Sequence, residues 1–167
     1  MLPRVLIFMG VSGCGKTAVG EEVARRSDAH FVDADGLHPP ENIAKMSAGI
    51  PLTDVDREPW LARVAAEAMA PGRNVVACSA LRRAYRDRIR RDVADAWFVF
   101  LEGSKELIFS RISARKGHFM KAGLLDSQLA TLEDPTHEDR VLVLPVTGTV
   151  TEIADAVFDY FSASGRH

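Results

Sequence analysis

The segment GVSGCGKT, residues Gly10–Thr17, decides how the rest of this chain is interpreted. It follows the apolar run RVLIFM at residues 4–9 and precedes a stretch with a helical pattern. The letters match G-x-x-x-x-G-K-[ST], a loop that joins a strand to a helix and surrounds phosphate groups with backbone N–H donors. Its glycines allow the backbone to bend toward a phosphate at the positive end of the following helix. The segment therefore predicts a triphosphate-binding loop.

Every position of this loop is a predicted nucleotide contact. The predicted contacts are Gly10, Val11, Ser12, Gly13, Cys14, Gly15, Lys16 and Thr17. Lys16 supplies a mobile cation for the β- and γ-phosphates, and the Thr17 hydroxyl is placed to bind Mg²⁺. Cys14 either is a small spacer or has a thiol whose pKa is lowered beside Lys16 and a helix N-terminus. The second alternative predicts that oxidants inactivate the nucleotide-free protein.

Five short β-rich runs alternate with helical patterns along the chain. They are RVLIFM (4–9), HFVD (30–33), NVVACSA (74–80), WFVFLE (97–102) and VLVL (141–144). This alternation predicts a parallel sheet of the α/β class, and the near-continuous apolar strands predict helices on both faces. A chain of 167 residues has room for one ordinary hydrophobic core, so we expect a single domain over residues 1–167.

Two helices can be anchored by their end signals. Thr149 and Glu152 form a predicted capping box before the last helix, whose apolar residues recur at helical spacing. Asp56 is a predicted cap and Pro59 a predicted first-turn residue for an earlier helix. The apolar stripe of that helix is interpreted as core rather than as a ligand platform. It comprises Trp60, Leu61, Val64, Ala65 and Ala68.

Composition and charge favour a small ligand over a macromolecule or a membrane. The net charge of -2 at pH 7 gives no electrostatic reason to expect nucleic acid or an anionic membrane as a partner. The two cysteines have no disulfide framework around them, and the first apolar run is too short for a signal sequence. We therefore expect a cytoplasmic protein that binds a small molecule.

Asp33 and Asp35 end the second predicted strand. In extended backbone, residues two apart project to the same face, so both carboxylates would face the phosphate loop if this strand end lies near it. One carboxylate can then hold Mg²⁺ through water while the other accepts a proton from an attacking hydroxyl, as phosphoryl transfer requires. The alternative is that both residues only cap and solubilise a turn.

The rest of the sequence favours a kinase among the proteins that use such a loop. It contains no N-K-x-D motif of the kind with which GTPases read the base, and no second basic motif typical of a motor ATPase. Two long polar stretches, residues 33–60 and 114–128, are candidates for binding segments or lids. Donors near the same sheet edge suit a polyhydroxylated or carboxylate substrate. They are His38, Lys45, Arg57, Arg82, Arg83 and Arg86.

Four linked motifs resemble the small P-loop gluconate kinases, which are relatives of shikimate kinase and the nucleoside monophosphate kinases. In chain order they are MGVSGCGKT (9–17), LHPPENIAKMSAGIPLTDVDREPW (37–60), CSALRRAYRDRIR (78–90) and ARKGHFM with LLDSQLATLEDP (114–135). The resemblance implies a three-layer P-loop nucleoside-triphosphate-hydrolase-like fold, with a five-stranded parallel sheet in the order 2-3-1-4-5 and a mobile lid. It also implies transfer of the γ-phosphate of ATP, with Mg²⁺, to the 6-hydroxyl of D-gluconate.

The resemblance further assigns roles to individual residues. It implies that Lys16, Asp35 and Arg115 are catalytic, with Asp35 as the base and Arg115 delivered to the transferring phosphate by the lid. The implied metal ligands are Thr17 and Asp33, and Arg111 is an implied nucleotide contact beyond the loop. The implied substrate contacts are Asp35, His38, Arg57, Arg82, Arg83 and His118. The substrate-binding segment would span about residues 35–60, and the lid about residues 115–127.

Other readings of the same residues stay open at this point. The chain could be a kinase for another small hydroxylated acid or a nucleoside monophosphate, or a regulatory module that binds nucleotide without catalysis. The paired carboxylates and the cationic lid argue against the module. Pro145 stands in the last strand where relatives often have an aspartate, so the sequence does not assign the contacts to the adenine base. A homodimer is compatible with the resemblance, because members of that family are commonly dimers.

Overall fold

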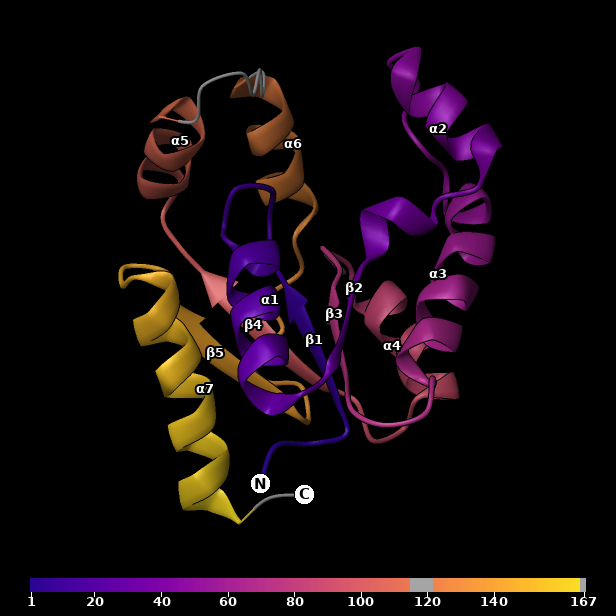
Figure 1. The fold of residues 1–167 in the computed structure, drawn as a ribbon. Coiled ribbons are helices and arrows are strands. Elements are labelled where there is room, and N and C mark those ends of the chain that lie inside the picture. The colour runs from indigo at the N-terminus through magenta and orange to yellow at the C-terminus, as the bar shows by residue number, and fades with distance from the viewer. Residues whose placement is uncertain (115–121, 166–167) are drawn as a thin grey trace.

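The computed structural model describes residues 1–114 and 122–165, in which five parallel strands form one sheet with helices on both faces (Figure 1). The strands are β1 (Val5–Met9), β2 (His30–Asp33), β3 (Asn74–Ala77), β4 (Trp97–Glu102) and β5 (Val141–Pro145). They lie in the order β2-β3-β1-β4-β5, and every neighbouring pair is parallel. The strand order implied by the resemblance is confirmed. All carboxyl ends meet at one edge, where open α/β sheets bind ligands.

The helices alternate with the strands as the sequence predicts. They are α1 (Lys16–Ser27), the 3₁₀ helix η1 (Ala34–Leu37), α2 (Pro40–Ser47), α3 (Asp54–Ala68), α4 (Arg83–Asp92), α5 (Lys105–Ala114), α6 (Ala122–Thr131) and α7 (Val150–Ser164). The polar stretch 33–60, a candidate binding segment or lid in the sequence, folds into η1, α2 and the first turns of α3. Within the described residues, no helix combines the length and hydropathy that crossing a bilayer requires.

The core is divided by the sheet into two layers. All five residues of β1 are buried, and alternate side chains enter opposite layers. Leu6 and Phe8 pack in the layer that α1 and α7 cover, whereas Ile7 and Met9 pack in the layer that α3 and α4 cover. A strand buried on both faces has no polar side, which explains why its sequence shows a continuous apolar run.

Helix α3 begins earlier than its sequence signals indicated. Thr53 is the cap: its hydroxyl accepts a hydrogen bond from the N–H of Asp56 at 3.2 Å, and the Asp56 carboxylate accepts one from the N–H of Thr53 at 2.9 Å. Asp56 is thus the third residue of a capping box, and Pro59 lies inside the helix rather than in its first turn. The predicted start at Asp56 is wrong, whereas the predicted box at Thr149 and Glu152 before α7 is confirmed.

The sequence suggested that Arg86 is a substrate donor near the sheet edge. This prediction is wrong, because Arg86 is a core residue. Its side chain is 0% exposed and pairs with Glu138, which is 7% exposed. The guanidinium also donates to the carbonyl oxygens of Ala80, Leu81 and Glu133 at 2.7, 3.1 and 3.0 Å. A buried charge needs this full set of partners. Arg86 therefore ties the turn after β3 to the segment between α6 and β5.

Candidate active site

The phosphate loop connects β1 to α1 at the carboxyl edge of the sheet. Gly15 caps α1 with a φ of 97°, a left-handed conformation that residues with a Cβ rarely adopt. Gly13 has a φ of 82°, and a Cβ added there would lie 2.4 Å from Cγ1 of Ile112 on α5. Glycine at position 13 thus allows α5 to pack directly on the loop.

Thr17 and Asp33 come together beside this loop. The Thr17 hydroxyl, in the first turn of α1, lies 3.3 Å from Oδ2 of Asp33 at the end of β2. A hydroxyl and a carboxylate are hard oxygen donors of the kind that Mg²⁺ prefers, and Mg²⁺ usually takes its other ligands from phosphates and water. Among the described residues no cluster of three His, Cys, Asp or Glu side chains surrounds a metal position. The pair therefore fits Mg²⁺ bound together with a nucleotide.

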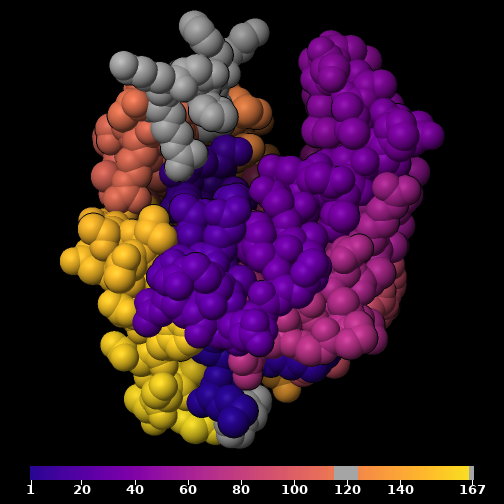
Figure 2. Space-filling view, in the orientation of Figure 1, coloured from indigo at the N-terminus to yellow at the C-terminus, as the bar shows by residue number. Residues whose placement is uncertain are grey.

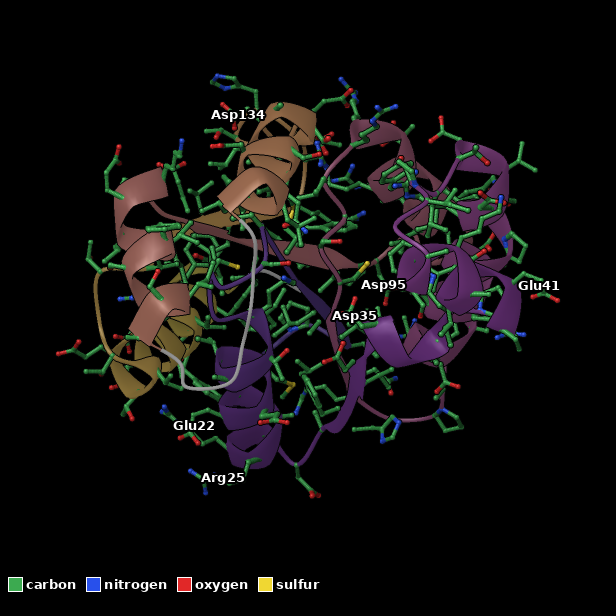
Figure 3. All side chains as sticks on the ribbon, turned by 90° about the horizontal axis from the view of Figure 1, so that it is seen from above. Glu22, Arg25, Asp35, Glu41, Asp95 and Asp134 are labelled. Atoms are coloured by element: carbon green, nitrogen blue, oxygen red, sulfur yellow. The ribbon has the colours of Figure 1, made fainter. Side chains whose placement is uncertain are left out.

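Asp35 does not continue the strand that carries Asp33. The second carboxylate oxygen of Asp33 accepts a hydrogen bond from the Asp35 N–H at 3.0 Å and so caps the helix η1. The expectation that both carboxylates project from one extended segment is wrong, because this cap turns the chain one residue after β2. Seen from above the sheet edge, Asp35 lies near the middle of the molecule (Figure 3). It lines a cavity there.

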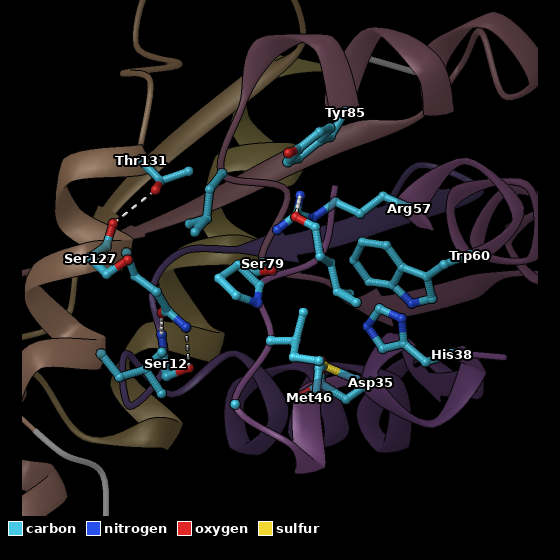
Figure 4. Close-up of a pocket in the computed structure, with 17 residues that line it drawn as sticks. Ser12, Asp35, His38, Met46, Arg57, Trp60, Ser79, Tyr85, Ser127 and Thr131 are labelled. Carbon is cyan, nitrogen blue, oxygen red and sulfur yellow. Dashed lines mark hydrogen bonds between the residues drawn. The ribbon is translucent and has the colours of Figure 1, made fainter. Parts of the chain in front are cut away.

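This cavity has a volume of about 700 Å³ and runs from the phosphate loop to α3 (Figure 4). Ser12 stands at its phosphate end and Asp35, His38 and Arg57 stand along the opposite side. Residues 49–52, between α2 and α3, form part of the wall. In the space-filling view the molecule is hollowed between α2 and the side formed by α5 and α6 (Figure 2). A nucleotide tail and a small second substrate would meet in this space.

The cavity wall near α3 holds two polar side chains in defined positions. The Arg57 guanidinium donates to the carbonyl oxygen of Leu52 at 2.8 Å, and its Cζ lies 5.3 Å from the centre of the Tyr85 ring. The His38 ring stacks on Trp60 with centroids 4.4 Å apart. Burial, together with the positive charge of Arg57, lowers the pKa of His38 below its usual value, although Asp35 acts in the opposite direction. The lowered pKa favours the neutral form of His38 at pH 7.

Trp60 belongs both to the core and to the cavity. It is 4% exposed and its indole N–H donates to the carbonyl oxygen of Ala34 at 2.7 Å. The apolar stripe of α3 is buried, as the sequence predicts. The sequence analysis interpreted Trp60 as a core residue rather than as part of a ligand platform. In the structure it is both, because its ring also lines the cavity and stacks against His38.

Three other cations that the sequence suggested as substrate donors, Lys45, Arg82 and Arg83, lie outside the residues that line the cavity. Arg82 is 3.9 Å from Asp54, Arg83 is 3.5 Å from Asp87, and neither is among the described residues that line the cavity. Lys45 donates to both carboxylate oxygens of Asp56 at 2.9 and 2.8 Å and so joins α2 to α3. For Arg82 and Arg83, contact with a substrate stays a prediction.

The lid residues are only partly covered by the structure. Arg111 lies in the last turn of α5, next to the Ile112 that packs on the phosphate loop. The predicted contacts Arg115 and His118 lie outside the described residues. The C-terminal part of the expected lid, from residue 122 onward, belongs to α6.

Cys14 is a spacer inside the loop rather than an activated thiol. It is 1% exposed, and burial raises the pKa of its thiol even though Lys16 and Arg111 act to lower it. The hypothesis of a lowered pKa is wrong for this structure, because desolvation outweighs the effect of the neighbouring cations. The sensitivity of the nucleotide-free protein to oxidants stays a prediction.

Comparisons with known proteins agree with this geometry. A family model described as an AAA domain matches residues 5–135. A gluconokinase from Gluconobacter oxydans (strain 621H) is 47% identical over 144 residues, which cover 84% of this chain and 81% of that protein. This chain belongs to the gluconokinase family. The thermoresistant gluconokinase of Escherichia coli (strain K12) is 42% identical over 163 residues, covering 92% of this chain and 93% of that protein.

A solved structure of the gluconokinase family supports the fold as well. The crystal structure of a gluconokinase from Sinorhizobium meliloti 1021 has a TM-score of 0.89 and 45% sequence identity to this chain. The match covers 96% of this chain and 93% of that one. The whole described arrangement of sheet, phosphate loop and helices is therefore that of a gluconokinase-family protein.

One contact of this gluconokinase-family site escaped the sequence analysis. The side-chain amide of Gln128 on α6 accepts from the Ser12 N–H at 2.7 Å and donates to the Ser12 hydroxyl at 3.0 Å. The motif LLDSQ contains this glutamine, but nothing in its spacing links it to a loop 116 residues earlier. Only the packing of α6 brings the two together. Ser79 and Tyr85 were likewise not predicted, although both line the cavity.

Proposed function

We propose that this chain transfers the γ-phosphoryl group of ATP to the 6-hydroxyl of D-gluconate and releases 6-phospho-D-gluconate. The observation that carries the proposal is the cavity of about 700 Å³ that joins the phosphate loop at Ser12 to Asp35 and Arg57. In a chain of the gluconokinase family, this cavity is the natural place for a sugar acid beside a nucleotide. A kinase for another hydroxylated acid or a nucleoside monophosphate is the alternative that a substrate panel tests.

The donor side of the proposed reaction is the phosphate loop. Its backbone N–H groups and Lys16 would hold the β- and γ-phosphates of ATP at the start of α1. Thr17 and Asp33 would hold Mg²⁺, which supplies charge neutralisation for the phosphate oxygens when it is bound. Arg111 and Arg115 would add positive charge around the transferring phosphoryl group.

The acceptor side is the wall that η1 and α3 form. Asp35 would accept the proton of the attacking hydroxyl, and Arg57 and His38 would bind oxygens of the sugar acid. Because Arg57 is anchored on Leu52 and lies near the Tyr85 ring, little of its side-chain entropy remains to be lost on binding. Arg82, Arg83 and His118 are further proposed substrate contacts. Catalysis would come from positioning and charge stabilisation rather than from a covalent intermediate.

The decisive experiment measures ADP release with a coupled assay. ATP and Mg²⁺ are supplied with D-gluconate, and in parallel with shikimate, other sugar acids and nucleoside monophosphates. We expect turnover with gluconate to exceed turnover with each other acceptor. Turnover with gluconate no faster than ATP hydrolysis alone would overturn the proposal, and a better acceptor in the panel would identify the alternative kinase.

Replacing Lys16 by alanine should lower kcat by about a hundredfold to a thousandfold, the usual loss when one positioned donor to a transition-state charge is removed. Among the described residues the Lys16 ammonium donates one hydrogen bond, of 3.4 Å, to the carbonyl oxygen of Val11, so the fold should persist. The coupled assay gives kcat, and thermal unfolding monitored by circular dichroism is the control. A variant with an unchanged melting temperature and nearly full kcat would contradict the role of Lys16.

Several expectations stay predictions within this proposal. They are the choice of ATP as the donor, a cytoplasmic location, a homodimer, a single domain over residues 1–167 and closure of a lid at about residues 115–127. Each follows from the sequence or from the family. Nucleotide competition and sedimentation of the purified protein test the donor and the homodimer directly.

A further inference from the structure

Asn42 connects the candidate site to the start of α3 through one side-chain amide. The residue lies in α2 and is 2% exposed, which is rare for asparagine. Its Nδ2 lies 2.9 Å from the carbonyl oxygen of Asp56 and 3.2 Å from Nδ1 of His38. The buried amide of Asn42 helps to hold these two partners in place, because leaving either of them unpaired would cost free energy.

The chemistry of these partners determines where the protons are. A backbone carbonyl oxygen can only accept, so the atom of Asn42 that faces Asp56 must be the NH₂ group. This group has two hydrogens, and His38 Nδ1 lies 3.2 Å from the same nitrogen, within reach of the second hydrogen. Nδ1 must then be the acceptor, which requires the neutral imidazole with its hydrogen on Nε2. Within the part of the chain that the structure describes, Nε2 has no hydrogen-bond partner in the protein.

The surroundings of His38 hold the ring in one orientation. The ring is stacked on Trp60 with an angle of 12° between the planes, and the Asn42 contact restricts rotation within that plane. The charged groups that act on it are Asp35 from η1 and Arg57 from α3. The Asp56 carboxylate, also from α3, forms an ion pair with Lys45. The net effect of burial and these charges lowers the pKa of His38, in agreement with a neutral ring.

We propose that Asn42 is a positioning residue that fixes His38 as the neutral Nε2–H imidazole, so that His38 offers the substrate one hydrogen-bond donor. A ring in this state binds an oxygen acceptor, such as a hydroxyl or carboxylate oxygen of a sugar acid. Protonation would turn Nδ1 into a second donor. Two donors, Nδ1–H of His38 and the NH₂ group of Asn42, would then face each other without an acceptor. The identity of the oxygen ligand rests on the proposed function, whereas the state of the ring does not.

The state of the ring can be measured without substrate. In protein labelled with ¹⁵N at histidine, the shifts of the two ring nitrogens distinguish the Nε2–H form, the Nδ1–H form and the cation. The His38→Gln variant assigns the signals among the five histidines. We expect the Nε2–H form at pH 7.5. A ring with its hydrogen on Nδ1, or a cation at this pH, would overturn the proposal even if gluconate is phosphorylated.

Kinetics of Asn42→Leu give the second measurement. Loss of one oriented hydrogen bond should raise KM for gluconate about tenfold with little change in kcat, and should raise the titration midpoint of His38. Lys45→Met is the matched control, because it removes the other side-chain link between α2 and Asp56 without touching His38. Its KM should stay within about twofold of the wild-type value.

The two variants separate a positioning role from a structural one. Equal increases of KM in Asn42→Leu and Lys45→Met would overturn the proposal, because loosening of α2 would then explain both. So would an unchanged titration of His38 in Asn42→Leu. An Nε2–H ring in a wild-type enzyme that does not phosphorylate gluconate would reject the proposed function and leave the assignment of the ring supported.

Discussion

Asp35→Asn should lower kcat for gluconate about a thousandfold, with KM for ATP close to the wild-type value. An asparagine side chain cannot take up the proton of the attacking hydroxyl, and a positioned general base contributes about a hundredfold to ten-thousandfold to a rate. Asp35 lines the cavity opposite the phosphate loop, where the acceptor hydroxyl of the proposed reaction would lie. The coupled ADP assay, run at saturating gluconate and ATP, measures the effect.

The fold of this variant should be intact. Among the described residues the Asp35 carboxylate accepts no side-chain or backbone hydrogen bond, and the bond to Asp33 uses the Asp35 N–H, which asparagine retains. Asp159→Asn is the matched control, since Asp159 is exposed on α7. Both variants should unfold at the wild-type temperature, and Asp159→Asn should keep full kcat. A wild-type kcat in Asp35→Asn would show that Asp35 is not the base.

Glu138→Gln should lower the free energy of unfolding by about 3 kcal/mol, because breaking a buried ion pair leaves an uncompensated buried charge. The Arg86 side chain is 0% exposed and the Glu138 carboxylate also accepts from Arg90 at 2.7 Å. Glutamine has nearly the same shape, but its NH₂ group would face guanidinium donors. Urea denaturation at pH 7 measures the loss. Glu22→Gln, which removes the partly buried partner of the exposed Arg25, is the control and should change the midpoint little.

The same pair predicts a dependence on pH. Burial by itself raises the pKa of Glu138, but hydrogen bonds from Arg86 and Arg90 outweigh it and lower the pKa below the ordinary value of 4.5. A lowered pKa in the folded state means that the contribution to stability is present above about pH 4.5 and is lost as the pH falls below it. The difference in stability between the wild type and Glu138→Gln should therefore shrink below pH 4.5. A constant difference from pH 7 to pH 3 would contradict this account.

The burial of Arg86 could not be predicted from the sequence. Arg82, Arg83 and Arg86 stand in one motif and have the same formal charge, so the sequence treats them alike. On α4, however, Arg86 points into the core, whereas Arg82 and Arg83 are exposed. What separates them is Glu138, 52 residues away, together with three carbonyl oxygens. No local pattern contains that information.

The phosphate loop illustrates the opposite case. Its glycines, Lys16 and Thr17 could be interpreted from eight letters, because the positions next to one another in the loop are also next to one another in sequence. The capping box at Thr149 was predictable for the same reason, since its hydrogen bonds span three residues. At α3, the sequence signals predicted Asp56 as the cap, and this prediction was wrong. Thr53 is the cap in the structure, and the Asp56 carboxylate that completes the box also accepts from Lys45 of α2.

The sequence by itself determined the class of fold, the position of the phosphate loop and the family, because strand periodicity, loop chemistry and linked motifs are local properties of the chain. Tertiary structure alone decided which polar side chains share the cavity, why the pKa of the Cys14 thiol is raised and which side chain lies beside Nδ1 of His38. Those outcomes depend on burial and on partners from distant segments. Desolvation and hydrogen-bond geometry exist only once the elements have packed against one another.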